Sequence, residues 1–186
     1  MKVFGYGSLI SAGSLAATLG RALPAPRPAF LPGYVAELVV GTDTRGLTDR
    51  YWTRPDGTVF DGVIASYGLV ERPGEYGCPG AVHDIPDSLL PALDARERDY
   101  ARMPVTLADT AGQRLAAVTY VQHPQAERVL EEACRTERAV VTQEYLDLVA
   151  GALAALAPDV LRRAAHPTHL PVVPLVFHEG SPPPVG

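Results

Sequence analysis

Hydrophobic positions in the first two thirds of the chain alternate with polar ones over short runs, and glycine, proline and aspartate separate the runs. A period of two is typical of strands that bury one face. Residues 101–109 and 113–122 fit a hairpin that turns at Ala111-Gly112. Further strands are predicted from Val3, at Tyr34–Val40, Thr58–Ser66 and Gly80–Ile85, and at Leu170–Phe177, an edge strand interrupted by Pro174.

Helices are predicted where hydrophobic residues recur at helical spacing. Thr142 is a good N-cap for a helix whose core-facing stripe is Leu146, Val149, Leu153 and Leu156. The other helices are expected at Ser11–Leu19, from Pro86-Asp87 to about Arg98, and from Pro124 to about Arg135. Strands with helices inserted singly predict an α+β fold around a curved sheet. The pattern does not distinguish a closed barrel from an open sheet.

Three segments are predicted to be irregular. Pro24–Pro28 is expected to be an extended connector, because alternate prolines remove the donors of a strand ladder. Gly41–Asp49 is a polar loop that either lines the mouth of a pocket or forms a solvated turn. Residues 67–79 are rich in glycine and proline, so we expect a long loop, either a lid beside an active site or a surface excursion.

The 186 residues favour one domain, residues 1–180, followed by a flexible Pro-rich tail at 181–186. The net charge of −5, without a basic cluster, argues against a nucleic-acid partner. The sequence shows neither an apolar run long enough for a membrane span nor a signal peptide. Cys78 and Cys134 are expected to be free thiols in a reducing cytoplasm. We expect no metal site and no cofactor.

The stretch Tyr6-Gly7-Ser8-Leu9 follows a short hydrophobic strand and precedes the first predicted helix. A glycine loop in this position directs unpaired backbone N–H groups into one small space, which suits an anion or a developing oxyanion. The alternative is an ordinary tight turn after an N-terminal strand.

Glu97 continues the apolar face of its predicted helix, four residues after Leu93 and seven after Leu90. A carboxylate that faces an apolar interior has a raised pKa and is a candidate general acid or base. The alternative is that the helix has frayed by this point and Glu97 points to water. Asp94 and Arg98 are four apart and are expected to form a surface pair.

Two motifs carry a resemblance to a known family. Tyr6-Gly7-Ser8-Leu9 after the first strand, and Leu93-Asp94-Ala95-Arg96-Glu97 followed by Tyr100, Arg102 and Val105, resemble the signatures of the γ-glutamylcyclotransferase-like family. The resemblance covers roughly residues 1–122. It implies a small mixed β-barrel flanked by helices, with the family's catalytic acid/base glutamate at position 97.

The reaction implied by the resemblance cleaves a γ-glutamyl amide by attack of its own α-amine and releases 5-oxoproline and a free amine or peptide. The substrate is then expected to lie against Tyr6, Gly7, Ser8 and Leu9. The Tyr100 ring is expected to flank Glu97 or cap the pocket, and Arg102 either binds a carboxylate as a fork or is an ordinary surface arginine.

Departures from the family pattern leave the substrate open. Arg98 stands where many members have glycine, and Ser11 where the glutathione-degrading ChaC-type enzymes carry tryptophan. These differences favour a γ-glutamyl amine or a natural-product intermediate over glutathione. Two other classes remain possible: a protein that binds a small acid without turnover, and a serine hydrolase acting through Ser8. The expected partner is a small γ-glutamyl molecule, and the protein is expected to be a monomer or homodimer.

Overall fold

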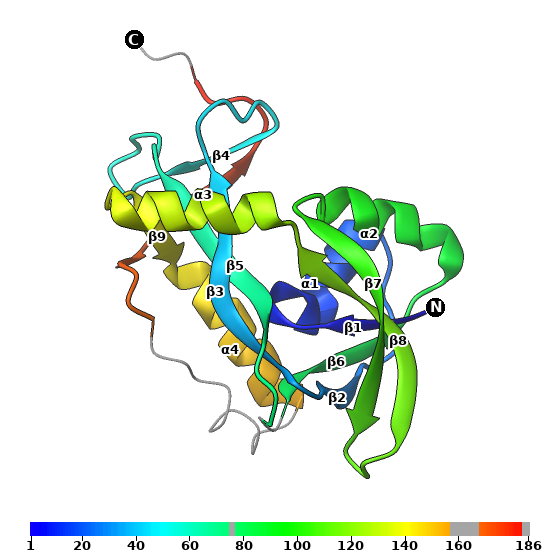
Figure 1. Ribbon diagram of the computed structural model, residues 1–186. Coiled ribbons are helices and arrows are strands. Elements are labelled where there is room, and N and C mark those ends of the chain that lie inside the picture. Colours follow the sequence, from blue (N-terminus) through cyan, green and yellow to red (C-terminus); the bar gives the residue numbers. More distant parts are fainter. Residues whose placement is uncertain (75–76, 157–167, 184–186) are drawn as a thin grey trace.

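A five-stranded closed barrel forms one half of the molecule in the computed structural model, which describes residues 1–74, 77–156 and 168–183 (Figure 1). The strand order is β1-β6-β2-β7-β8. β1 runs parallel to β8 and the other neighbours are antiparallel, which makes the barrel mixed. The strands span Lys2–Gly5 (β1), Cys78–Asp84 (β6), Arg27–Leu31 (β2), Tyr100–Asp109 (β7) and Arg114–Gln122 (β8). The predicted α+β fold with a small mixed barrel is confirmed.

A second layer lies beside the barrel and is built on two long antiparallel strands, β3 and β5. Its main sheet has the order β10-β9-β5-β3, and a separate two-stranded ribbon pairs β4 with β11. The strands span Tyr34–Asp43 (β3), Val63–Glu71 (β5), Ala139–Thr142 (β9), Val172–Val173 (β10), Arg50–Thr53 (β4) and Val176–Glu179 (β11).

The helices pack on both layers: α3 lies against β3 and β5, and α1 and α2 lie against barrel residues. α3 crosses β3 and β5 (Figure 1) and buries Leu130 and Ala133 against them. α1 packs with α2, and α4 packs against the short 3-10 turn η1 through Val149 and Leu153. They span Ala12–Leu19 (α1), Leu90–Arg96 (α2, preceded by the 3-10 turn η2 at Asp87–Leu89), Pro124–Arg135 (α3), Gln143–Leu156 (α4) and Gly7–Ile10 (η1).

The helix boundaries follow the capping residues that the sequence indicates. Thr142 Oγ1 accepts a hydrogen bond from the Tyr145 N–H at 3.2 Å, so the predicted N-cap of α4 is confirmed. Gly20 ends α1 in the left-handed conformation, with φ 64°. In the described part of the chain, no helix has the length and apolar character needed to cross a membrane.

The predicted loop at residues 67–79 is wrong. β5 continues to Glu71 and β6 begins at Cys78, so only a short connection separates them. Gly68 favoured the prediction of a loop, but it lies within β5. Position 68 requires a glycine because neighbouring side chains occupy the space that a Cβ would fill. A Cβ there would lie 2.6 Å from Val39 and 2.7 Å from the Gln122 amide. The glycine therefore marks a close approach between elements.

Other strands were placed incorrectly or missed. The connector predicted at Pro24–Pro28 runs into β2, which closes the barrel between β6 and β7. The strand predicted at Thr58–Ser66 begins only at Val63, and β4 and β9 were not predicted. The edge strand predicted at Leu170–Phe177 is two strands in different sheets, because the chain changes partner around Pro174. Residues 184–186 of the predicted tail lie outside the described residues.

Candidate active site

A cavity of about 640 Å³ lies where the barrel meets the second layer, a volume typical of small-molecule sites. Its walls come from η1 and α1, the end of α2, the strands β3, β5 and β7, the start of α4, and the β4–β11 ribbon. The lining residues used below are Ser8, Ser14, Thr42, Arg50, Trp52, Ser66, Arg96, Glu97, Asp99, Tyr100, Glu144, Tyr145 and Phe177.

Glu97 lines the cavity from the C-terminal end of α2. Its N–H donates to the Leu93 carbonyl at 2.9 Å, and its backbone leaves the helix there, with φ −89° and ψ 35°. Leu90 and Leu93 on the same helix face are buried, and Glu97 is only 9% exposed. The structure therefore places Glu97 inward, as its spacing from the two leucines predicts. Burial raises the pKa of this carboxyl, and the neighbouring Arg96 charge partly offsets the rise.

Arg96 links Glu97 to the N-terminal loop. Its Nε lies 2.9 Å from Glu97 Oε1. Its terminal nitrogens donate to Ser8 Oγ, to the Ser14 hydroxyl and carbonyl oxygens, and to Thr18 Oγ1, at 2.9 to 3.1 Å. Sequence reasoning missed Arg96, because adjacent helical residues do not normally share a face. The turn at the end of α2 brings both side chains to one place.

The loop Tyr6–Leu9 divides between the cavity and the core. Ser8 lines the cavity, whereas Leu9 is buried and the Tyr6 hydroxyl donates to the Tyr120 carbonyl at 2.6 Å inside the molecule. The Leu9 N–H donates to the Tyr6 carbonyl at 3.2 Å. The N–H groups of Gly7 and Ser8 have no hydrogen-bond acceptor among the described residues. Of these two residues, Ser8 lines the cavity and Gly7 is buried beside it.

Gly7 has to be glycine on two grounds. Its φ is 55°, in the left-handed region, and a Cβ there would lie 2.9 Å from the Tyr145 hydroxyl. That hydroxyl in turn accepts a hydrogen bond from the Tyr67 N–H at 3.0 Å. The start of α4 therefore packs directly against the glycine loop.

Tyr100 lines the cavity close to Glu97, at the start of β7. Its hydroxyl donates to the Tyr67 carbonyl at 3.0 Å and lies 3.1 Å from Ser66 Oγ. Burial raises the pKa of the Tyr100 hydroxyl, with the Glu97 charge adding to the effect. Tyr100 therefore stays protonated and is held by the second layer.

Arg102 does not reach the cavity. Its guanidinium lies 3.3 Å from the Asp94 carboxylate, on the outer side of β7. Asp94 also accepts a hydrogen bond from the Tyr120 hydroxyl at 2.7 Å. The predicted Asp94–Arg98 pair is wrong, since Arg98 instead pairs with Asp49 at 3.0 Å. The helix ends before position 98, so the four-residue spacing does not apply there.

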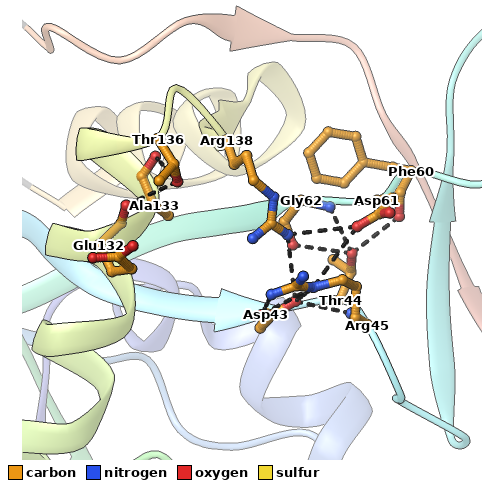
Figure 2. Close-up of polar contacts among 10 residues, drawn as sticks. All are labelled: Asp43, Thr44, Arg45, Phe60, Asp61, Gly62, Glu132, Ala133, Thr136 and Arg138. Atoms are coloured by element: carbon orange, nitrogen blue, oxygen red, sulfur yellow. Dashed lines mark hydrogen bonds and ion pairs between the residues drawn. The ribbon is translucent and has the colours of Figure 1, made fainter.

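The polar segment predicted at Gly41–Asp49 has two sides. Thr42 lines the cavity, whereas the next residues form an ion-pair network at the surface (Figure 2). Arg45 pairs with Asp43 at 2.7 Å, and Arg138 reaches both Asp43 and Asp61.

The Thr44 hydroxyl accepts a hydrogen bond from the Gly62 N–H and donates one to the Phe60 or Gly62 carbonyl. These contacts fasten the end of β3 to the start of β5, just before the chain enters β4.

The β4–β11 ribbon forms the wall that sequence reasoning missed. Trp52 faces Phe177 across the two strands, and their rings meet edge to face with centroids 5.3 Å apart. Arg50 lies on the same face of β4, two residues earlier. Tyr51 points to the other face, where it stacks on His178 at 4.7 Å. Of these two neighbouring aromatic residues, Trp52 lines the cavity and Tyr51 does not.

Comparison with known proteins gives the family. The sequence profile described as gamma-glutamyl cyclotransferase, AIG2-like, matches residues 3–139. No curated protein matches the chain at a significant level.

Solved structures share the fold at low sequence identity. A gamma-glutamyl cyclotransferase aligns with a TM-score of 0.58 and 16% identity, covering 91% of this chain and 89% of the other. An uncharacterized protein from Homo sapiens gives the same score and identity, with 90% and 89% covered. A gamma-glutamyl cyclotransferase specific to glutathione from yeast gives 0.55 and 16%, with 91% and 98% covered.

The profile covers well over half of the chain, and the closed mixed barrel and both motifs agree with it. The protein belongs to the gamma-glutamyl cyclotransferase, AIG2-like family.

Proposed function

We propose that the protein is a γ-glutamyl cyclotransferase in which Glu97 is the general acid and base. The observation that carries the proposal is the Glu97 carboxyl, buried at the cavity wall with a raised pKa and fixed by Arg96. A carboxyl whose pKa is raised holds a proton more readily than an ordinary carboxyl, so it can take up a proton and return it during a reaction.

The substrate supplies its own nucleophile. Glu97 accepts a proton from the α-ammonium group, and the free amine attacks the γ-carbonyl carbon to close a five-membered ring. Because both groups belong to one molecule, holding it folded gives the proximity that catalysis needs. The Gly7 and Ser8 N–H groups are suitable donors for either the tetrahedral oxyanion or the α-carboxylate. Glu97 then returns the proton to the departing nitrogen, and 5-oxoproline and an amine are released. No step requires a cofactor.

Ser8 is poorly placed to act as a nucleophile. Its Oγ accepts a hydrogen bond from Arg96 at 3.0 Å, and a guanidinium cannot remove its proton. His83 is the histidine that approaches the loop, but its Nε2 lies 2.9 Å from the Leu9 carbonyl oxygen. Within the described residues, Ser8 Oγ has no histidine or carboxylate as a hydrogen-bond partner. This arrangement supports the cyclisation over a serine hydrolase.

The test is release of 5-oxoproline, measured by mass spectrometry, from glutathione, γ-glutamyl dipeptides, γ-glutamyl-lysine and γ-glutamylated aminoglycosides. Glu97→Gln should lower the rate by about 10²- to 10⁴-fold, the usual loss when a general base is removed. Asp94→Asn is the matched control, because it removes a carboxylate from the same helix outside the cavity. Its rate should stay close to that of the wild type.

Three other outcomes would contradict the proposal. Full activity of Glu97→Gln would remove the glutamate from the mechanism. Release of free glutamate in place of 5-oxoproline would indicate hydrolysis. Binding of γ-glutamyl compounds without any release would indicate a small-acid-binding protein on the same fold.

A further inference from the structure

His83 is a buried titratable side chain that does not line the cavity and takes no part in the proposed reaction. It belongs to β6 and is 1% exposed. Val82 on the same strand packs in the barrel core, so His83 points to the opposite face, towards η1. On that face Ala81 and Ile85 flank it, and both are buried in apolar clusters. A polar ring in such surroundings is costly unless it is hydrogen-bonded.

One hydrogen bond fixes where the His83 imidazole carries its proton. The Nε2 atom lies 2.9 Å from the Leu9 carbonyl oxygen. A carbonyl oxygen can only accept, so Nε2 is the protonated nitrogen. Nδ1 is buried and has no hydrogen-bond partner among the described residues. A second proton at Nδ1 would create a charged donor without an acceptor, so this position selects the neutral ring.

The elements packed around His83 offer no charge that would stabilise a protonated ring. η1 and α1 contain no acidic or basic side chain. The charged groups of the other neighbouring elements are engaged elsewhere or exposed: Lys2 pairs with Asp84, the Met1 ammonium with Asp87, Arg96 with Glu97, and Arg102 with Asp94, while Asp147 is bonded to Gln143 and Glu144 is exposed. Burial therefore lowers the pKa of His83, and the hydrogen bond to Leu9 offsets only part of this effect.

The carbonyl that His83 holds belongs to the last residue of the Tyr6–Leu9 loop. The backbone hydrogen bonds that close this turn are 3.2 and 3.3 Å long, above the usual length of about 3.0 Å. The bond from His83 is shorter, at 2.9 Å, and it comes from β6. Gly5 of β1 lies against the same carbonyl, since a Cβ at position 5 would overlap its oxygen. The imidazole and the Gly5 backbone therefore fix the position of the Leu9 carbonyl.

Ser8, the residue before Leu9, connects this carbonyl to the cavity. Its Oγ accepts a hydrogen bond from Arg96 at 3.0 Å, and Arg96 Nε lies 2.9 Å from Glu97 Oε1. The N–H groups of Gly7 and Ser8 that lack an acceptor among the described residues belong to the same turn. A displaced Leu9 carbonyl would therefore shift both these N–H groups and the serine that meets Arg96.

We infer that His83, in its neutral form with the proton on Nε2, is a positioning residue that fixes the Tyr6–Leu9 loop at the cavity through the Leu9 carbonyl. Its effect on catalysis rests on the proposed cyclotransferase function. The protonation of the ring and the position of the loop do not rest on that function, so they are tested without turnover.

NMR of the wild type labelled with nitrogen-15 at histidine tests the protonation of the ring. Nε2 of His83 should give the signal of a protonated nitrogen and Nδ1 that of an unprotonated one. At pH 6.5, the ordinary pKa of histidine, the ring should still be mainly neutral. The spectrum of His83→Gln identifies the signals, because one of the five histidines is then missing. A neutral ring protonated on Nδ1, or a ring that is half charged at pH 6.5, would overturn the inference.

Two substitutions separate the hydrogen bond from the volume of the ring. His83→Gln keeps a donor, because the glutamine amide can take the place of Nε2, whereas His83→Leu fills the space without a donor. His83→Leu should lower kcat for 5-oxoproline release by about 10- to 100-fold, the loss expected when reacting groups are displaced. His83→Gln should stay within about threefold of the wild type, since it retains the hydrogen bond.

His123→Gln is the matched control for these variants. It removes an exposed histidine at the start of α3, outside the cavity. Its kcat should equal that of the wild type. Melting temperatures of all three variants show whether the whole fold or the loop alone has changed.

Hydrogen exchange tests the position of the loop without turnover. Exchange at Leu9 and Ser11, whose N–H groups close the turn, should be faster in His83→Leu than in the wild type and in His83→Gln. Equal exchange in the two His83 variants would overturn the inference, and so would equal kcat values if the wild type releases 5-oxoproline. If the wild type releases none while the NMR and exchange results are as expected, the cyclotransferase function fails and the positioning of the loop by His83 stands.

Discussion

The two ends of the cavity differ in how completely their polar groups are satisfied. At the barrel end, Arg96 is bonded to Glu97, Ser8 and Ser14, and the Tyr100 hydroxyl is bonded to the Tyr67 carbonyl. At the ribbon end, Arg50 Nε has no hydrogen-bond partner within the described part of the chain, and the Phe177 ring is partly exposed. Groups that take part in a reaction benefit from being fixed in advance, whereas groups that recognise a substrate are completed by it. The proposed reaction is therefore suited to the barrel end, where the polar groups are already fixed by hydrogen bonds.

The largest expected effect comes from disturbing the barrel end through Gly5. A Cβ at position 5 would lie 2.2 Å from the Leu9 carbonyl oxygen and 2.6 Å from its carbon, both backbone atoms that no rotamer change can move. Gly5→Ala should therefore displace the Tyr6–Leu9 loop, cost about 3 kcal/mol of unfolding free energy and abolish 5-oxoproline release. Denaturant unfolding and the activity assay measure the two effects.

Gly13→Ala is the control for Gly5→Ala. In α1, a Cβ at position 13 meets only Ser11 Oγ at 3.7 Å, an ordinary contact. The variant should gain up to about 1 kcal/mol, because alanine favours helix over glycine. Equal unfolding free energies and equal activities of the two variants would show that the Tyr6–Leu9 loop does not depend on the close approach at Gly5.

Arg96→Gln should have the next largest effect, and it should change the pH profile. The variant loses the charge that partly offsets the burial of Glu97, so the pKa of Glu97 should rise further. The general base is then protonated up to a higher pH, and the acid limb of kcat/KM should move upward. The lost hydrogen bonds should cost about 1–3 kcal/mol of stability.

The neighbouring arginine distinguishes a local charge effect from a general one. Arg98→Gln removes the same charge from a pair with exposed Asp49. Arg98→Gln should leave the acid limb of the kcat/KM profile at the same pH as in the wild type. An acid limb that does not move in Arg96→Gln would show that another group controls the pH dependence.

At the ribbon end, Trp52→Ala should raise KM and leave kcat nearly unchanged. The indole forms part of the wall contributed by the β4–β11 ribbon, so its loss should weaken binding by about 1.5 kcal/mol, or about tenfold in KM. Tyr51→Ala is the matched control, because Tyr51 stacks on His178 on the opposite face of β4. Equal changes in KM from both variants would contradict the assignment of the wall.

The same comparison explains what the sequence could predict. The inward position of Glu97 follows from its spacing to Leu90 and Leu93, and the start of α4 follows from Thr142, because both are local relations along one helix. The pairing of Trp52 with Phe177 joins strands 125 positions apart, and no local period carries that information. Proline and glycine also misled the prediction, since Pro28 and Gly68 both lie inside strands. At Gly68, neighbouring side chains occupy the space that a Cβ would fill.

The smallest expected effect is a change in the thermal stability of Glu97→Gln relative to the wild type, and this change depends on pH. The pKa of Glu97 is raised in the folded protein, so folding is favoured when this group is protonated. That contribution is fully present below the ordinary value of 4.5 and is lost as the pH rises through the raised folded value. Glu97→Gln does not titrate. Its melting temperature relative to the wild type should therefore increase between pH 4.5 and pH 8.

Asp84→Asn should give the opposite trend. Lys2, 2.6 Å away, lowers the pKa of Asp84, so this carboxylate adds stability above its ordinary value of 3.8, and that stability is lost as the pH falls. The melting temperature of Asp84→Asn relative to the wild type should therefore fall as the pH rises towards 3.8, and it should stay level above that value. Differential scanning fluorimetry from below pH 3.8 to pH 8 measures both variants. A melting temperature of Glu97→Gln that stays level or falls relative to the wild type between pH 4.5 and pH 8 would show that the buried carboxylate of Glu97 carries no cost, which would contradict the proposed mechanism.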